Sequence, residues 1–376
     1  MRVVFDAYWW VNGPAALRHV LREIVLAWHQ EFPGDTLALV VRRGEEHEVR
    51  ASAPPGTTVV PTRLRPQALL ASVAAERVRR RLGYDVVLVH NFAARSRGTS
   101  AVYLHDVMFV TNPEWFSRIE LAYFSRMVRW APRADVVFAS TATEAGRIRA
   151  HTAAQRVLPV GLGLSTELLH GGDERAVAGL EPHGFLLTVG RLNVRKNLGR
   201  SILGALASGE VSAQRPLVVV GGAGGKSEQP DPEVERATAD GLVRFLGHVD
   251  EAQLRWLYRH TRAFVFLSLG EGFGMPPVEA LAFGAPVVVS DLPVFRENLA
   301  GRATFTDPCD TEAIAGALRS TLAAGRSQAD ADETAAAVAI QHDWRSSVRR
   351  MRGALAERVA GTGTGTVPAG AREDIP

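Results

Sequence analysis

The stretch Ser268 to Val288, SLGEGFGMPPVEALAFGAPVV, decides the fold class and the kind of ligand that we expect. The overlapping apolar run Ala263 to Leu269, AFVFLSL, is typical of a buried parallel strand. Pro276 and Pro277 suit the first turn of a helix. The unit is therefore a strand, a glycine loop and a helix.

Two carboxylates flank this junction, Glu271 in the loop and Glu279 on the helix. The unpaired N–H groups of a helix start and the helix dipole favour an anion, and glycines let the backbone approach it closely. Glutamates would repel a phosphate, so we expect them to accept hydrogen bonds from neutral hydroxyls. A ligand that carries both phosphates and hydroxyls is a nucleotide sugar.

In this frame, EGFGMPPVEALAFGAPVV, the chain resembles the retaining GT-B glycosyltransferases, specifically glycosyltransferase family 4, in which Glu271 and Glu279 match an E-x7-E motif. The resemblance covers the chain to about Leu355, and its specific motifs are concentrated in the second half. It implies an α/β protein with the GT-B fold, in which two Rossmann-like doubly wound domains face each other across a cleft. The alternative is an ordinary strand, loop and helix with surface glutamates.

The length of 376 residues and the hydrophobic content of 46% allow two domain cores. We expect an N-terminal acceptor-binding domain over 1–170 and a linker over 171–183. A nucleotide-sugar donor-binding domain follows over 184–341, then a helix over 342–360 that crosses back to the first domain. The low-complexity tail 361–376 is predicted to be disordered.

Apolar runs and helical spacing place the elements of both domains. The first domain is expected to contain strands Arg2 to Phe5, Leu37 to Val41, Val86 to His90, Ala101 to Leu104 and Asp135 to Ala139, with helices Ala15 to Gln30, Gln67 to Leu82 and Ile119 to Trp130. The second is expected to contain strands Phe185 to Val189, Leu217 to Val220 and Val287 to Ser290 beside the run at Ala263, with helices Leu198 to Leu206 and Ala252 to His260.

Composition narrows the partners and the compartment. Cys309 is the single cysteine and cannot form an internal disulfide, and no run of about 20 apolar residues is present. We read no signal peptide and expect a soluble, cytoplasmic protein.

The 43 basic and 40 acidic residues leave a net charge of only +3, so no nucleic-acid partner is expected. Arginines 77, 79, 80 and 81 close the predicted helix 67–82 and are either a solvated helix end or a peripheral surface for anionic lipid headgroups.

A second motif contains basic residues that we expect to lie at the same anion site. The segment GRLNVRKN follows the predicted strand Phe185 to Val189 and places Arg191 and Lys196 at its carboxyl end. Such side chains are usual partners of a diphosphate, and the resemblance assigns both to the donor diphosphate. Arg195 has no match in the motif and is expected to face solvent.

Other donor contacts are expected from the resemblance. The loop that contains Gly222 is similar to a family turn near the donor, or is a plain turn; the run VVVGGAGGKS is not a P-loop, because Val220 stands where a glycine is needed. The segment FLGHVDE resembles the part that binds the nucleobase, and Gly13 matches one glycine of a paired-glycine loop whose other position is Asn12. The further expected donor-binding residues are His248, Val249, Leu254, Gly272, Phe273, Gly274 and Met275.

In the first domain, His105 and Asp106 follow the predicted strand Ala101 to Leu104 and resemble an HD-containing loop of the family. By this resemblance His105 would touch the donor sugar or order the reacting groups, and Asp106 would border the acceptor. Trp115 is a further acceptor candidate. Trp9 and Trp10 either stack on an acceptor sugar or pack the domain edge.

The implied reaction is transfer of a hexosyl group, first of all mannosyl from GDP-mannose, to a hydroxyl of a glycan, a lipid-linked or a small-molecule acceptor with retention of configuration. Glu271, His105, Arg191 and Lys196 are the expected catalytic residues. No metal and no further cofactor are expected, since the cations would take the place of a metal ion at the diphosphate. The alternatives are a noncatalytic sugar-nucleotide-binding subunit and a GT-B epimerase or phosphorylase.

Overall fold

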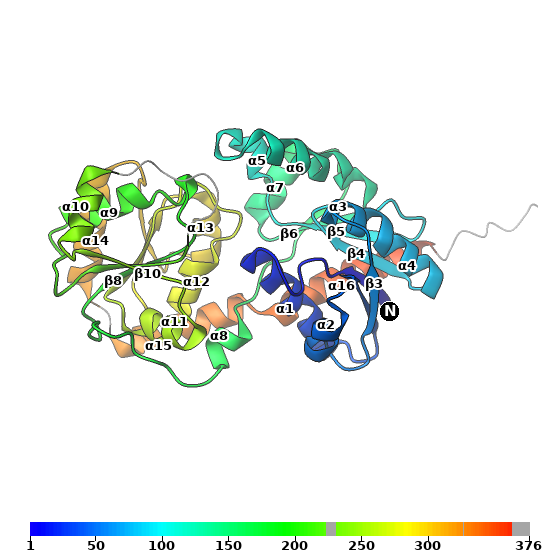
Figure 1. The fold of residues 1–376 in the computed structure, drawn as a ribbon, viewed down its shortest axis with the longest axis horizontal. Coiled ribbons are helices and arrows are strands. Elements are labelled where there is room, and N and C mark those ends of the chain that lie inside the picture. Colours follow the sequence, from blue (N-terminus) through cyan, green and yellow to red (C-terminus); the bar gives the residue numbers. More distant parts are fainter. Residues whose placement is uncertain (223–230, 326, 363–376) are drawn as a thin grey trace, which may run out of the picture.

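The computed structural model describes residues 1–222, 231–325 and 327–362. They form two parallel sheets, each surrounded by helices, with the first sheet in the blue to green part of the chain and the second in the green to yellow part (Figure 1). The α/β class and the pair of Rossmann-like sheets predicted from the sequence are confirmed. The predicted disordered tail lies outside the described residues from position 363 onward, as does the glycine-rich run after Gly222.

The first sheet has seven parallel strands in the order β3-β2-β1-β4-β5-β6-β7. The chain starts in the middle of the sheet, so the direction of winding reverses between β1 and β4. The strands are β1 (Arg2–Asp6), β2 (Thr36–Arg42), β3 (Thr58–Thr62), β4 (Val86–His90), β5 (Thr99–Leu104), β6 (Val136–Ala139) and β7 (Val157–Pro159).

The second sheet has six parallel strands in the order β10-β9-β8-β11-β12-β13, with its own reversal between β8 and β11. Ligands of open α/β sheets bind at the carboxyl ends of the strands beside such a reversal. The strands are β8 (Leu186–Val189), β9 (Leu217–Val220), β10 (Val243–Gly247), β11 (Ala263–Phe266), β12 (Val287–Ser290) and β13 (Thr304–Thr306).

The helices connect these strands and cover the sheets. Those of the first half are α1 (Ala15–Glu31), α2 (Glu46–Ser52), α3 (Gln67–Leu69), the π-helical turn Leu70–Ala74, α4 (Ala75–Leu82), α5 (Met108–Thr111), α6 (Arg118–Trp130), α7 (Ala142–His151) and α8 (Thr166–His170), with 3₁₀ turns at Pro113–Trp115 and Ala131–Arg133. Those of the second half are a 3₁₀ turn at Val194–Lys196, α9 (Leu198–Ala207), α10 (Pro232–Ala239), α11 (Glu251–His260), α12 (Met275–Ala282), α13 (Pro293–Leu299), α14 (Thr311–Ala324), α15 (Gln328–Gln341) and α16 (Trp344–Thr362).

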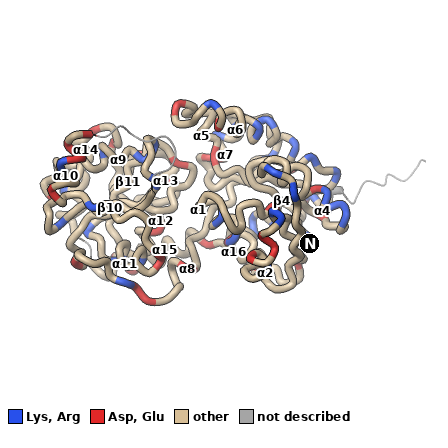
Figure 2. The backbone as a smooth tube through the Cα atoms, in the orientation of Figure 1, with Lys and Arg blue, Asp and Glu red and all other residues tan. Residues whose placement is uncertain are grey.

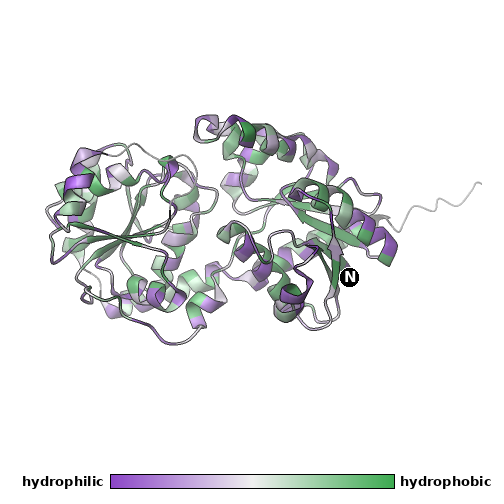
Figure 3. Cartoon of the chain, viewed as in Figure 1, coloured by the Kyte–Doolittle hydropathy of each residue, from purple (hydrophilic) through white to green (hydrophobic). Residues whose placement is uncertain are grey.

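The strands are apolar on both faces because helices cover both. Every residue of β4 and β5 is buried, and in Figure 3 the strands are green while the outward helix faces are purple. The predicted helix 67–82 is one helical stretch interrupted by the π-helical turn. Several elements had no counterpart in the sequence prediction, among them α2, β3, α8, α10, α14 and α15.

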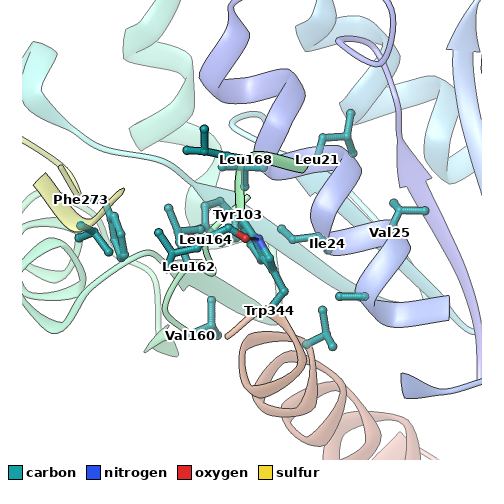
Figure 4. Close-up of a cluster of buried hydrophobic side chains, with 14 of the residues drawn as sticks. Leu21, Ile24, Val25, Tyr103, Val160, Leu162, Leu164, Leu168, Phe273 and Trp344 are labelled. Carbon is teal, nitrogen blue, oxygen red and sulfur yellow. Dashed lines mark hydrogen bonds between the residues drawn. The ribbon is translucent and has the colours of Figure 1, made fainter. Parts of the chain in front are cut away.

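The last helix returns to the first domain. Helix α16 packs against α1, and its first residue, Trp344, donates its indole N–H to the carbonyl of Leu164 over 3.0 Å. Around Trp344, side chains of α1, β5 and the chain after β7 form one buried cluster that also receives Phe273 from the loop after β11 (Figure 4). The apolar core is therefore continuous between the two halves.

Candidate functional site

The glutamate of the glycine loop is held by two cations. One carboxylate oxygen of Glu271 lies 2.6 Å from Lys196 Nζ, and the other lies 3.0 Å from an Arg195 guanidinium nitrogen. The Glu271 side chain is only 8% exposed. All three lie at the carboxyl ends of β8 and β11, beside the reversal of the second sheet.

The electrostatics of this cluster are decided by the ion pairs. Burial alone would raise the pKa of Glu271, but Arg195 and Lys196 outweigh it and lower this pKa to about 2. Burial lowers the pKa of Lys196, and Glu271 opposes this shift only in part. Lys196 also lies 4.4 Å from the centre of the Phe266 ring. Glu271 is thus an anion at every pH where the protein is expected to work.

The prediction that Arg195 faces solvent is wrong. Its guanidinium also donates to the carbonyl of Gly270 over 3.1 Å and contacts Met108 Sδ of the first domain at 3.7 Å. The 3₁₀ turn Val194–Lys196 places Arg195 beside Lys196 and against Glu271, whereas Arg191 is exposed after the end of β8. The motif spacing alone could not report the direction of this turn.

The second glutamate has a different environment. Glu279 on α12 accepts a hydrogen bond of 2.8 Å from the hydroxyl of the buried Tyr258 on α11. Burial raises the pKa of Glu279 to about 7, Tyr258 opposes this shift, and Glu251 adds to it. The two glutamates of the motif therefore differ in charge near neutral pH.

Glycines set the backbone around this site. Gly274, with φ +82°, starts α12, and a Cβ there would lie 2.3 Å from the Phe295 ring. Gly221, with φ +133°, brings the ends of β8 and β9 together, because a Cβ there would lie 1.9 Å from the carbonyl oxygen of Gly190. Gly222 follows and is exposed. The anion site expected from the sequence therefore has close backbone packing on both sides.

The predicted nucleobase segment lies at the same edge of the second sheet. His248 is exposed in the turn after β10, while Val249 and Leu254 are partly buried against the core. Glu251 at the start of α11 raises the pKa values of both Tyr258 and Glu279, so this turn lies near the second glutamate. Met275 is half-buried at the start of α12, whereas the side chain of Phe273 lies in the core between the domains, 5.5 Å from the His342 ring.

Residues of the first domain pack against the loop that contains Glu271. A Cβ added at Gly272 would lie 3.1 Å from both the His105 carbonyl oxygen and Asp106 Cβ, and one at Gly270 would lie 2.8 Å from the Trp115 ring. His105 and Asp106 therefore contact the glutamate loop, and Trp115 covers it. Burial raises the pKa of Asp106, and Arg195 opposes this shift. Burial, with the neighbouring His90, holds the pKa of His105 well below its usual range.

Hydrogen bonds join the glutamate loop and helix α13 to the first domain. Ser140 Oγ donates to the carbonyl of Gly272 over 3.0 Å, and Arg147 donates to the carbonyl of Glu271 over 2.9 Å. Glu297 of α13 accepts from the backbone N–H groups of Ala142 and Thr143, at 2.6 and 2.8 Å, at the start of α7. These contacts fix the glutamate loop relative to the first domain.

The two tryptophans of the first loop have different positions. Trp10 is fully buried and donates to Ser52 Oγ over 2.9 Å, which favours domain packing over acceptor stacking. Trp9 is half-buried and donates to Gln67 Oε1 over 3.0 Å. Gly13 is exposed, with φ +151°, and packs so closely against the Trp9 ring that a Cβ would lie 2.2 Å away. This loop precedes α1, whose first turn projects toward the second domain (Figure 1).

Two residues that sequence reasoning missed lie at the ends of strands in the first sheet. Asp6 ends β1 and His90 ends β4, the two strands beside the reversal, and their Oδ1 and Nδ1 atoms are 2.8 Å apart. Both side chains are buried. A polar residue at the carboxyl end of an apolar strand was the signal that could have found them.

Comparison with known proteins finds a matching family model and several relatives. Residues 173–338 match the family model of the glycosyl transferases group 1. O-antigen chain mannosyltransferase B of Escherichia coli is 28% identical over 228 residues, which are 58% of this chain and 60% of that protein. The chain thus spans about three fifths of the length of that relative.

Solved structures share the fold at low identity. Sucrose-phosphate synthase from Thermosynechococcus elongatus superposes with a TM-score of 0.68 at 17% identity, covering 96% of this chain and 100% of that one. HepE of Anabaena, solved in complex with UDP and glucose, gives 0.65 at 19% identity, covering 95% and 100%. These likenesses confirm the predicted GT-B fold.

Proposed function

We propose that the chain transfers a hexosyl group from a nucleoside diphosphate sugar to an acceptor hydroxyl with retention of configuration, because residues 173–338 match the family model of the glycosyl transferases group 1. The observation that carries the proposal is the cluster of Glu271, Arg195 and Lys196 at the reversal of the second sheet, opposite His105. Arg195 and Lys196 would bind the diphosphate of the donor. The carboxylate of Glu271 would stabilise the positive charge that develops on the sugar during transfer.

The roles follow from charge. Breaking the bond to the donor sugar builds negative charge on the leaving diphosphate, which Lys196, Arg191 and the N–H groups at the start of α12 would stabilise. Glu271 would hold hydroxyls of the sugar and support its positive ring. Glu279, whose pKa is near neutrality, would accept from the ribose hydroxyls. Closure of the cleft would keep water from the donor.

We further propose that the sugar is mannosyl and the donor GDP-mannose, since the O-antigen relative is named a mannosyltransferase. The acceptor would be a glycan, a lipid-linked saccharide or a small molecule. The cations would make a metal unnecessary. Full activity after treatment with a chelator would support this, and loss that Mg²⁺ restores would refute it.

The deciding experiment is a melting-temperature screen with GDP-, UDP-, dTDP- and ADP-sugars, followed by donor hydrolysis and transfer assays. A ligand that binds only the folded protein raises its melting temperature. We expect one nucleotide sugar to stabilise the native protein, and both Glu279→Ala and Lys196→Ala to abolish the effect. No stabilisation by any donor would overturn the proposal.

A peripheral membrane contact is proposed for the end of α4. Arg77, Arg80 and Arg81 are exposed there, and Figure 2 shows basic residues along α4 and also α6. Arg79 is not part of this surface, because it pairs with Glu76 at 2.7 Å. None of the described helices is both long and apolar enough to cross a membrane. Sedimentation with vesicles of anionic lipid, lost when these three arginines become glutamine, tests the contact; unchanged sedimentation would refute it.

A further inference from the structure

Four consecutive carbonyl groups of the glutamate loop, those of residues 270–273, accept hydrogen bonds from side chains. The first accepts from Arg195 over 3.1 Å and the last from Asn298 over 2.7 Å, and both donors belong to the second domain. The two middle carbonyls, of Glu271 and Gly272, accept from the first domain instead. The backbone at the candidate catalytic glutamate is therefore held by a domain other than the one that contains it.

The donors of the first domain lie at the start of α7 and within it. The hydroxyls of Ser140 and Thr141 donate to the carbonyl of Gly272 over 3.0 and 3.4 Å. Arg147 donates to the carbonyl of Glu271 over 2.9 Å. Helix α7 packs against α13, on the side of the first domain that faces the second (Figure 1). Arg147 is thus a cationic donor that reaches across the domain boundary.

A buried carboxylate orients Arg147. The nitrogen Nη1 that contacts Glu271 also donates to Glu144 Oε2 over 3.1 Å. The other oxygen of Glu144 accepts from the backbone N–H of Val107 over 2.9 Å, in the loop that starts at His105. The Glu144 side chain is only 1% exposed, and bonds to both oxygens fix its position. Glu144 therefore connects the loop of His105 to the loop of Glu271 through Arg147.

The position of this backbone matters for the proposed chemistry. A reacting group that is displaced by about 1 Å can lose roughly a hundredfold in rate. The carboxylate of Glu271 is paired with Arg195 and Lys196 of the second domain, whereas Arg147 contacts its carbonyl. Loss of Arg147 would leave the cations for a diphosphate in place and release the backbone that carries the carboxylate.

We propose that Arg147, oriented by Glu144, is a positioning residue that sets the backbone of Glu271 for the sugar-transfer step. The proposal rests on the proposed function for the identity of that step. It adds that the first domain completes the geometry of a loop in the second. A nucleoside diphosphate then binds without Arg147, whereas transfer requires it.

Kinetics and binding separate these two effects. We expect Arg147→Gln to lower kcat by at least about tenfold and to leave the affinity for GDP, the diphosphate of the proposed donor, within about twofold of native. An interaction that is needed only in the transition state lowers kcat and spares ground-state binding. Steady-state assays and calorimetric titration measure the two quantities. An unchanged kcat, or a parallel loss of GDP affinity, would overturn the proposal.

Two variants distinguish positioning from a general effect on α7. Both contacts of Arg147 come from one nitrogen, so the ammonium of Arg147→Lys should restore kcat to within about threefold of native. The matched control is Arg149→Gln, because Arg149 lies on the same helix and also donates to a carbonyl, that of Val157 over 2.8 Å, but within the first domain. Its kcat should stay within about twofold. No rescue by lysine, or an equal loss in Arg149→Gln, would refute the assignment.

Methionine methyl signals report the position of the loop without any turnover. Met108 of the first domain lies 3.7 Å from Arg195, beside the loop, and Met275 starts α12 directly after it. In NMR spectra of methyl-labelled protein, Arg147→Gln should shift both signals and leave that of Met127, in the core of the first domain, unchanged. Native positions of the Met108 and Met275 signals in this variant would contradict the proposal.

Two further arms keep the test decisive. If Arg147→Gln does not fold, Glu144→Gln replaces it: the Val107 N–H holds the amide oxygen, so the amide NH₂ faces Arg147 and cannot accept from it. We expect kcat to fall by at least about threefold, and an unchanged kcat would overturn the proposal. If the native protein neither hydrolyses nor transfers any donor sugar, the proposed function fails, while the methyl signals still decide whether Arg147 sets the loop.

Discussion

In this structure, Glu271 pairs with the cations that a donor diphosphate would also need. Arg195 and Lys196 each contact one of its carboxylate oxygens. A bound diphosphate would compete for the same donors, and Glu271 would then be released toward the sugar. In this structure the ion pairs keep the buried carboxylate charged.

Arg195 should consequently affect turnover. We expect Arg195→Gln to lower kcat/KM for the donor by at least about tenfold, because one of the two cations for which a bound diphosphate would compete is lost. Steady-state kinetics measure this. Arg200→Gln is the control, since it removes the same charge from an exposed position on α9. Equal rates for native protein and Arg195→Gln would refute a role for Arg195.

Glu279 should make donor binding depend on pH. Burial raises its pKa to about 7, against a usual value of 4.5, although the bond from Tyr258 opposes this shift. Only the carboxylate accepts from two ribose hydroxyls, so donor affinity should rise roughly tenfold between pH 6 and 8. Calorimetric titration across this range measures it. In Glu279→Gln the rise should vanish, and a rise that persists would assign the titration to another group.

The same shift predicts a change in stability, with its sign set by linkage. A raised pKa in the folded state means that the contribution of Glu279 is fully present below pH 4.5 and is lost as pH rises through about 7. Relative to native protein, Glu279→Gln should therefore gain free energy of unfolding from pH 5 to pH 8. Urea denaturation at both values tests this, and an equal difference at both would contradict it.

At the scale of elements, Glu297 couples helix α13 to the first turn of α7. It accepts from the N–H groups of Ala142 and Thr143, and a carboxylate at a helix start also favours the dipole. We expect Glu297→Ala to speed hydrogen exchange of these two amides by about tenfold or more, because such bonds contribute about 1.5–3 kcal/mol. Glu333→Ala, at an exposed position on α15, is the control. Unchanged exchange of the two amides in Glu297→Ala would contradict a stabilising role of Glu297 at the start of α7.

The observed strands agree with the sequence prediction where the run of apolar residues is continuous. The bounds of β4, β9 and β12 agree with the runs predicted for them, because strands buried on both faces are continuously apolar. Helices α14 and α15 escaped prediction because alanine-rich segments lack a sharp apolar stripe. Helix α8 falls in a glycine-rich segment and is a single short turn capped by Ser165.

At the scale of the whole molecule, α16 ties the end of the described chain to its start. Arg352 donates two hydrogen bonds, of 2.8 and 2.9 Å, to Asp35, which also accepts from the amino terminus. Burial would raise the pKa of Asp35, but Arg352 and the amino terminus outweigh it, so this pKa is lowered.

This pair should stabilise the protein in a pH-dependent way. A lowered folded-state pKa gives stability that is present above the usual value of 3.8 and is lost as pH falls through the folded-state value. We expect Asp35→Asn to lower the melting temperature at pH 7, with a smaller difference near pH 3. Arg349→Met, which breaks the exposed pair with Glu31, should cost at most about 1 kcal/mol. A constant effect of Asp35→Asn with pH would refute the linkage.

The sequence by itself determined the two-sheet architecture, the junction of Glu271 and Glu279 and the cations of the GRLNVRKN segment, because apolar periodicity and glycine spacing are local properties of the chain. Only the tertiary structure decided that Arg195 faces inward, that Trp10 is core, and that Asp6 and His90 meet. Those facts depend on which strands become neighbours: Asp6 and His90 are 84 positions apart and are joined by the pairing of β1 with β4. No pattern within either segment records that pairing.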